Sequence, residues 1–109
     1  MAQPARGEVW LTDLGYIAKV RPCLVLSVPF LGDERSLVTL VPHTTSPRTS
    51  RFEVPLPLRF LRPGVFDAQS LVTVPSVKLL RRLGVLSEPQ LALVEVAVAA
   101  WLGLRPSTP

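Results

Sequence analysis

Short apolar runs, separated by prolines and glycines, make up most of the chain and predict a small sheet of antiparallel strands. The runs are rich in valine, leucine, threonine and phenylalanine with partial alternation, and twelve prolines keep each run short. Turn residues stand at Gly15, Gly32-Asp33 and Pro63-Gly64. We therefore expect a mainly β fold whose strands cover residues 8–12, 22–28, 36–41, 51–56 and 65–74.

The clearest helix signal follows Ser87. This serine is a favourable N-cap, Gln90 completes a capping box, and Pro89 suits a first turn whose N–H groups have no partner. Gly103 can end the helix. Its apolar residues fall on more than one face, which favours contact with a second subunit; a loosely amphipathic helix lying on the sheet is the alternative. The stretch 75–83 fits either a short helix or a strand that Gly84 ends.

Length and composition predict one domain over residues 1–109, with a core from about 6 to 104 and a short flexible tail. An apolar share of 48% excludes a wholly disordered chain. No apolar run reaches the length of a membrane span, and the first residues lack the apolar stretch of a signal peptide. We expect a soluble, cytoplasmic protein without a membrane partner.

The net charge of +4 favours an anionic partner. Lysine supplies only Lys19 and Lys78 among the twelve basic residues, so ten are arginine. Arginine pairs bidentately with phosphate and stacks on bases, which points to nucleic acid, although solubility alone also gives a small protein some net charge.

Cys23 is the only cysteine, which excludes an internal disulfide and a cage of cysteine ligands. Because it lies inside an apolar strand, we expect a buried thiol and not a nucleophile.

A candidate site lies at the ends of two predicted strands. Arg21 precedes the run 22–28, and three hydroxyl residues follow the run 36–41: Thr44, Thr45 and Ser46. A fixed guanidinium beside several hydroxyls suits a phosphodiester. The alternatives are a salt bridge from Arg21 to Asp13 or Glu8, and threonines that only satisfy backbone groups in a turn.

Three more polar residues flank this cluster. His43, the only histidine, is a candidate acid or base, although strand alternation turns it away from Thr44 and favours a packing role. Arg48 and Arg51 follow the hydroxyls and can bind backbone phosphates, or they are ordinary solvated charges.

The order of these segments resembles the MazF/PemK family of toxin endoribonucleases from bacterial toxin–antitoxin systems. The resemblance runs from about residue 6 to residue 104 and is carried by six segments: Arg6 to Leu14, Arg21 to Ser27, Val41 to Ser46, Phe52 to Leu56, Gln69 to Leu71 and Leu83 to Ser87.

The resemblance implies an SH3-like barrel with a C-terminal helix that forms a homodimer and is neutralised by an antitoxin. It implies cleavage of single-stranded RNA, such as mRNA, without a metal or cofactor, leaving a 2′,3′-cyclic phosphate and a 5′-hydroxyl. Arg21 and Thr44 would be catalytic. The implied substrate-binding residues are Thr45, Ser46, His43, Arg48, Arg51 and Gln69.

Two features depart from the family pattern. The loop 15–20 is short and lacks an acidic residue, and the chain has Asp67-Ala68-Gln69 where many relatives place aspartate directly before glutamine. Strand alternation would put Asp67 and Gln69 on one face. The alternative function is therefore an inactive nucleic-acid-binding module, or a toxin that acts on a protein such as gyrase.

Overall fold

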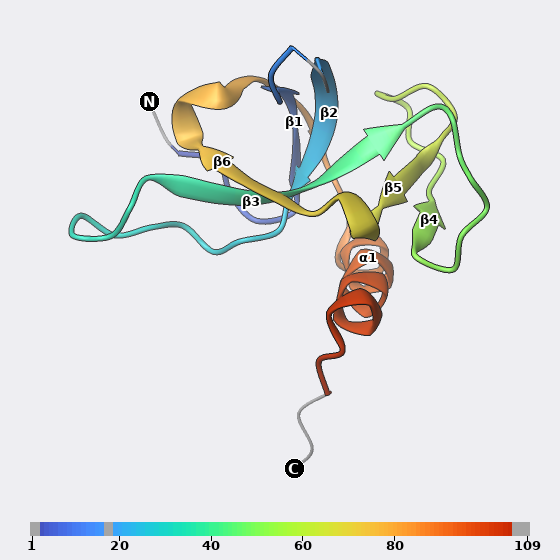
Figure 1. The fold of residues 1–109 in the computed structure, drawn as a ribbon. Helices are drawn as coiled ribbons and strands as arrows, with labels where there is room; N and C mark the ends of the chain where they lie inside the picture. Colours follow the sequence, from blue (N-terminus) through green and yellow to red (C-terminus); the bar gives the residue numbers. More distant parts are fainter. Residues whose placement is uncertain (1–2, 17–18, 106–109) are drawn as a thin grey trace.

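The computed structural model describes residues 3–16 and 19–105, and it is mainly antiparallel β-sheet with one C-terminal helix, as predicted (Figure 1). The elements in chain order are β1 (Glu8–Asp13), β2 (Val20–Val25), β3 (Leu37–Thr44), β4 (Glu53–Pro55), β5 (Val65–Asp67), the 3-10 turn η1 (Ala68–Ser70), β6 (Val72–Pro75), the 3-10 turn η2 (Ser76–Lys78), β7 (Leu79–Val85) and α1 (Glu88–Leu102). No helix in the described part is long and apolar enough to cross a membrane. Most of the predicted tail, residues 106–109, lies outside the described residues.

The long strand β3 joins two parts of one curled sheet. Its first half pairs with β6, its middle residues 40–42 pair with β2, and its last two residues pair with β5. The strand order is therefore β4-β5-β3-β2-β1-β7, with β6 beside β3. In Figure 1 α1 lies below β5 and β4, at one end of the sheet. The sheet therefore curls around two small cores.

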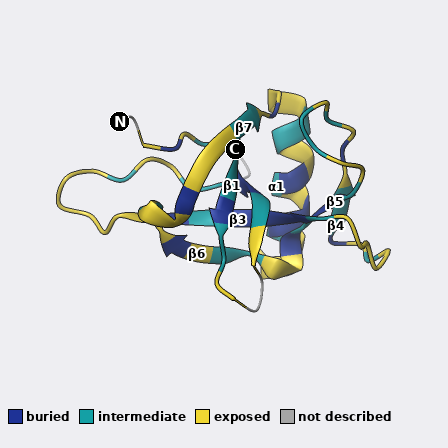
Figure 2. Cartoon of the chain, turned by 90° about the horizontal axis from the view of Figure 1, so that it is seen from above, coloured by how far each residue is buried: buried dark blue, intermediate teal, exposed yellow. Residues whose placement is uncertain are grey.

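β2 and β3 are buried on both faces, which explains their nearly continuous apolar sequences. Leu24 and Val41 pack in a cluster that includes Val94 of α1, whereas Cys23 and Leu40 pack in a second cluster closed by β6 and the start of β7. Figure 2 places this buried centre between exposed loops. Because side chains of both strands pack in these clusters, the ends of β2 and β3 are held in place.

The predicted burial of Cys23 is confirmed. Burial raises the pKa of its thiol to about 11. The thiol is therefore protonated at neutral pH and is a poor nucleophile.

The strand predicted over residues 36–41 was too short, because β3 continues through Pro42 and His43 to Thr44. The strand predicted over 22–28 was shifted. β2 begins at Val20 and ends at Val25. It ends there because the Ser27 hydroxyl accepts a hydrogen bond from the Thr39 N–H at 2.9 Å, and a continuing strand would need that N–H for its own backbone pairing.

The strand predicted over residues 65–74 is interrupted by η1. His43 of β3 pairs with Phe66, and Leu40 of β3 pairs with Val72. The register of pairing differs by three residues between these two pairs, which is the length of the turn. Asp67 causes the break by capping the turn: its carboxylate accepts the Gln69 N–H at 3.1 Å and the Ser70 hydroxyl at 2.8 Å.

The C-terminal half follows the sequence prediction closely at α1. Ser87 and Gln90 form the capping box, and Gly103 ends the helix with a left-handed φ of 68°. The ambiguous stretch 75–83 contains both predicted structures, a turn at η2 and a strand at β7. Gly84 does not end the strand, which runs to Val85.

Candidate active site

The candidate site lies where β2 and β3 separate. Their last pair is Cys23–Pro42, and continuing this register places Arg21 opposite Thr44. The ladder stops there because neither Pro22 nor Pro42 has an N–H to donate, and because the end of β3 turns to pair with β5. Arg21 and Thr44 therefore face each other on one side of the seam between the two strands, beyond their last ladder pair.

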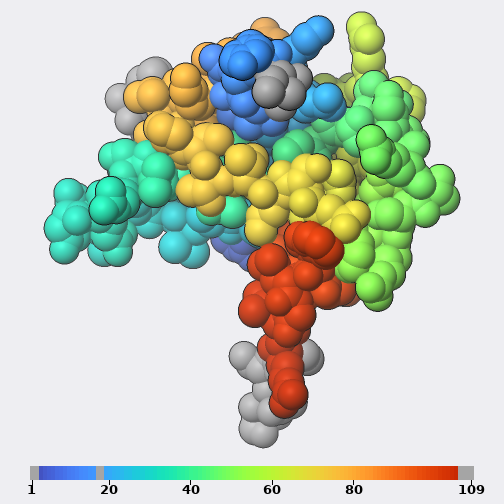
Figure 3. All heavy atoms as spheres, viewed as in Figure 1, coloured from blue at the N-terminus to red at the C-terminus, as the bar shows by residue number. Residues whose placement is uncertain are grey.

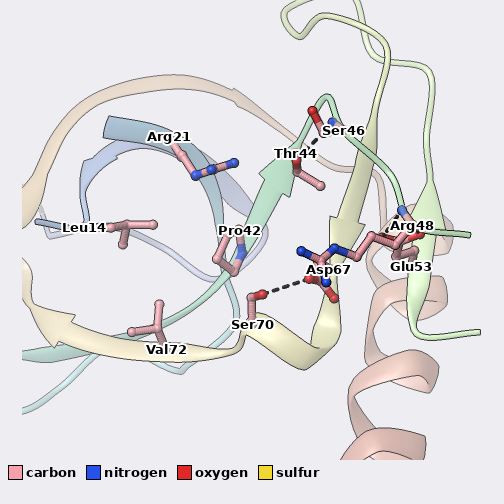
Figure 4. A pocket seen from close by; sticks show the side chains of 10 residues that line it. All are labelled: Leu14, Arg21, Pro42, Thr44, Ser46, Arg48, Glu53, Asp67, Ser70 and Val72. Carbon is pink, nitrogen blue, oxygen red and sulfur yellow. Dashed lines mark hydrogen bonds between the residues drawn. The ribbon is translucent and has the colours of Figure 1, made fainter. Parts of the chain in front are cut away.

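An open pocket on this side of the seam, which we call the Thr44 pocket, has a volume of about 460 Å³. Figure 4 shows the side chains that line it, which come from β2 to β6, from η1 and from the loops after β1 and β3. Its polar lining consists of two guanidinium groups, three hydroxyls and two carboxylates: Arg21, Arg48, Thr44, Ser46, Ser70, Glu53 and Asp67. Leu14, Pro42 and Val72 supply the apolar wall.

The Thr44 hydroxyl is fixed by its own turn. Its oxygen accepts the Ser46 N–H at 3.1 Å. Because this bond uses an acceptor position of the hydroxyl, the hydroxyl proton can still be donated to a ligand. Thr44 thus both shapes the turn, which was the alternative interpretation, and presents a donor to the pocket.

Glu53 fixes the loop that carries the second guanidinium. Its carboxylate accepts the backbone N–H of Arg48 at 2.9 Å and that of Ser50 at 3.1 Å. These hydrogen bonds, with that of Arg48 the largest cause, lower the pKa of Glu53. Glu53 is therefore ionised at neutral pH and is a weak base.

Asp67 is the other carboxylate of the pocket. From the sequence it could not be assumed catalytic, because alanine stands where many relatives have aspartate and regular strand alternation would put Asp67 and Gln69 on one face. That alternation was wrong, since residues 68–70 form a 3-10 turn in which Ala68 is buried and Gln69 is exposed. Asp67 and Ser70 line the Thr44 pocket, and Gln69 does not.

A second hollow, which we call the Thr45 groove, opens on the other face of the same seam and has a volume of about 740 Å³. Alternation at the end of β3 separates the two, because Thr44 lines the pocket and its neighbours His43 and Thr45 line the groove. Arg21 lines both. The groove also takes lining residues from β1, β7 and the loop before β5.

His43 points away from Thr44, as alternation predicts, and lines the Thr45 groove. It is only 3% exposed, its ring lies edge-on to that of Phe66 at 5.0 Å between centroids, and its Nε2 has no hydrogen-bond partner in the described structure. Burial lowers the pKa of His43, so the imidazole is neutral at neutral pH. Its packing role is clear, and its substrate contact stays a prediction.

The remaining predicted residues divide between the hollows and the surface. Ser46 and Arg48 line the Thr44 pocket. Arg51 lines neither hollow, and its guanidinium lies 4.4 Å from the centre of the Phe52 ring in a cation–π contact.

The carboxylates considered as salt-bridge partners of Arg21 have other contacts. Glu8 pairs with Arg82 at 3.1 Å, and Asp13 accepts the Gly15 N–H at 2.9 Å. The short loop 15–20 contributes Lys19 and Val20 to the groove, and its residues 17–18 lie outside the described part.

Sequence reasoning missed Glu53 and Ser70. Neither adjoins the predicted hydroxyl cluster along the chain, and the turn that brings Ser70 to the pocket depends on Asp67 as its cap. The available signal was Asp67 followed three residues later by a serine, a pattern in which the aspartate can bond locally instead of continuing a strand.

The small antiparallel β domain with one helix opens onto a pocket whose arginines and hydroxyls are the groups that suit a phosphate-like oxyanion. Residues 5–102 match the model of the PemK-like, MazF-like toxins of type II toxin–antitoxin systems. The chain belongs to this family.

Solved structures agree with this assignment. An endoribonuclease from a mycobacterial species, in complex with its cognate antitoxin, is 26% identical with a TM-score of 0.79, covering 98% of this chain and 100% of that one. MazE-MazF from Deinococcus radiodurans is 26% identical with a TM-score of 0.78, covering 96% and 100%. The Mycobacterium tuberculosis toxin MazF-mt6 is 27% identical with a TM-score of 0.78, covering 90% and 98%.

Proposed function

We propose that this chain is an endoribonuclease toxin that cuts single-stranded RNA in the cytoplasm, with Arg21 and Thr44 at the reaction centre. The observation that carries the proposal is that both side chains line one open pocket, opposite each other across the β2–β3 seam. Similar chains that are described as endoribonucleases support the reaction class.

RNA brings its own nucleophile, so the pocket must position the phosphodiester and stabilise its charge. The 2′-oxygen forms a bond to phosphorus while the bond from phosphorus to the 5′-oxygen breaks. The departing 5′-oxygen takes a proton from water, and the products are a 2′,3′-cyclic phosphate and a 5′-hydroxyl. Negative charge grows on the two non-bridging oxygens, where the Arg21 guanidinium and the Thr44 hydroxyl proton can each donate a hydrogen bond.

The proton of the 2′-hydroxyl needs an acceptor, and Asp67 is the better placed carboxylate for it. Each of its oxygens accepts one hydrogen bond, from Gln69 N–H and from Ser70, which leaves acceptor capacity directed to the pocket. Glu53 is the weaker candidate because backbone N–H groups lower its pKa.

The test is cleavage of a long single-stranded RNA in EDTA by the parent protein and by Arg21→Ala and Thr44→Ala. Matched controls are Arg59→Ala, which is exposed and outside both hollows, and Thr73→Ala on β6. We expect cleavage by the parent and the controls, and a loss of about a hundredfold or more in each pocket variant. Absence of cleavage by the parent on any RNA would overturn the proposal.

We propose two protein partners as well. The first is an antitoxin, because structures of similar chains contain one. The second is another copy of this chain, because α1 leaves large apolar side chains exposed: Leu93, Val96, Trp101 and Leu102. Covering them in a homodimer would remove this surface from water.

A further inference from the structure

We propose that the Thr45 groove binds the stretch of RNA next to the cut, so that the strand crosses the β2–β3 seam at Arg21. In this arrangement Lys19, Arg62 and Arg81 contact phosphates and Phe60 contacts a base. The proposal rests on the proposed function, since it extends the same substrate beyond the Thr44 pocket.

The groove is positively charged on both of its walls. Lys19 and Arg21 come from the β1–β2 side, Arg81 from β7 and Arg62 from the loop before β5, and no carboxylate lines the groove within the described part of the chain. Lys19, Arg62 and Arg81 make no ion pair with any described residue. Their charges are therefore available to an anionic ligand, unlike that of Arg82, which pairs with Glu8 at 3.1 Å.

An aromatic ring is fixed on the same wall. Phe60 lies so close over Gly84 of β7 that a Cβ at this glycine would come within 2.4 Å of the ring. The ring is half-buried and lines the groove. Proteins that bind single strands combine a cationic groove for the backbone with aromatic faces for the bases, and a rigid ring loses little entropy on stacking.

The two hollows share one lining residue, Arg21 of the proposed reaction centre. The successive residues Thr44 and Thr45 turn to opposite faces of the seam. A phosphodiester held at Arg21 therefore has its neighbouring nucleotide at the mouth of the groove. The volume of about 740 Å³ gives room for that nucleotide, being within the range of roughly 300–1,000 Å³ that small-molecule sites occupy. In Figure 3 the yellow-green tip of the loop before β5 stands apart from the blue β1–β2 hairpin.

The binding test uses fluorescence anisotropy with labelled 2′-O-methyl RNA of random sequence, in which the nucleophile is blocked. Arg62→Gln and Arg81→Gln are compared with Arg59→Gln and Arg82→Gln, which remove the same charge outside the groove. We expect each groove variant to lower the slope of log affinity against log salt by roughly 0.7, the contribution of one phosphate contact in a single strand. Equal slopes in groove and control variants would overturn the proposal.

Cleavage separates this proposal from the proposed function. We expect Arg62→Gln and Arg81→Gln to lose the advantage that longer RNAs give the parent over a minimal RNA, whereas Arg59→Gln and Arg82→Gln keep it. If the parent cuts RNA and the groove variants behave like their controls at every length, the groove proposal fails and the function stands. If the parent binds through Arg62 and Arg81 but cuts nothing, the function fails. Weakened binding of poly-L-glutamate with unchanged RNA binding would overturn the RNA assignment in favour of an acidic protein segment.

Discussion

At the scale of single residues, Asp67 has two roles that a conservative substitution can separate. Its carboxylate caps η1 and also faces the Thr44 pocket. Asparagine keeps an oxygen that can accept the Gln69 N–H, but it cannot take up a proton.

We therefore predict that Asp67→Asn lowers the cleavage rate by about 10²–10⁴, the usual contribution of a general base, while the melting temperature changes little. Single-turnover cleavage and thermal unfolding measure the two effects, with Asp33→Asn in the exposed β2–β3 loop as the matched control. A cleavage rate equal to that of the parent would exclude Asp67 as the base.

His43 makes stability depend on pH. Burial lowers its pKa, so the native state binds the proton less readily than the unfolded chain does. The stability that depends on neutral His43 is present above the unfolded pKa of about 6.5 and is lost as the pH falls through the folded pKa. Glu8 and Glu53 have lowered pKa values and titrate at lower pH.

We predict that the free energy of unfolding of the parent falls between about pH 7.5 and pH 5.5, whereas that of His43→Gln stays nearly constant. Urea titrations at several pH values give both curves. Parallel curves for the two proteins would show that another group governs this range.

At the scale of elements, the pairing of β3 with β5 sets the position of Thr44. Gly64, just before β5, lies against this pair, and a Cβ there would come 2.2 Å from the Thr44 carbonyl oxygen and 2.7 Å from His43 Cε1. A backbone carbonyl within a ladder cannot easily move aside, so a methyl group must displace the end of β3.

We predict that Gly64→Ala destabilises the fold by about 1–3 kcal/mol, the usual cost of overpacking, and lowers cleavage at temperatures where the protein is still folded. Gly32→Ala is the matched control, because a Cβ there meets nothing within 4 Å. Thermal unfolding and cleavage rates test both variants. Equal behaviour of the two alanines would contradict the proposed role of Gly64.

Much of the fold could be predicted from the sequence, because local signals dominate it. The capping box at Ser87, the end of α1 at Gly103 and the strand β1 follow from short patterns. The interruption at residues 68–70 could not be predicted from alternation. Val72 resumes the pairing with β3, so a regular strand and an interrupted one show nearly the same apolar pattern.

The candidate site was predictable where it depends on strand ends and not where it depends on loops. Arg21 and Thr44 each adjoin a recognisable apolar run, and the register of β2 and β3 brings them opposite each other. Glu53 reaches the pocket because its carboxylate binds the N–H groups of Arg48 and Ser50, a loop geometry that has no periodic signal.

At the scale of the whole molecule, one side of α1 needs a partner. Val94, Ala97 and Val98 are buried against the sheet, but Leu93 and Val96 are 55% and 69% exposed. This exposure agrees with the sequence, in which apolar residues occur on more than one face of the helix.

We predict that Val96→Glu converts a dimer into a monomer, because a carboxylate cannot be buried in an apolar interface without a partner. Sedimentation velocity measures the change, with Val77→Glu as the control, since Val77 is 81% exposed on η2 and away from α1. A parent protein that sediments as a monomer at every concentration would contradict the homodimer.

A double-mutant cycle on RNA cleavage, with Arg21→Ala, Thr44→Val and the double variant, measures directly whether Arg21 and Thr44 act on the same phosphodiester. If both side chains hold the same phosphodiester in one pocket, the double variant loses much less than the product of the two single losses. Single losses that multiply, or single variants that cut RNA at the parent rate, would contradict the account.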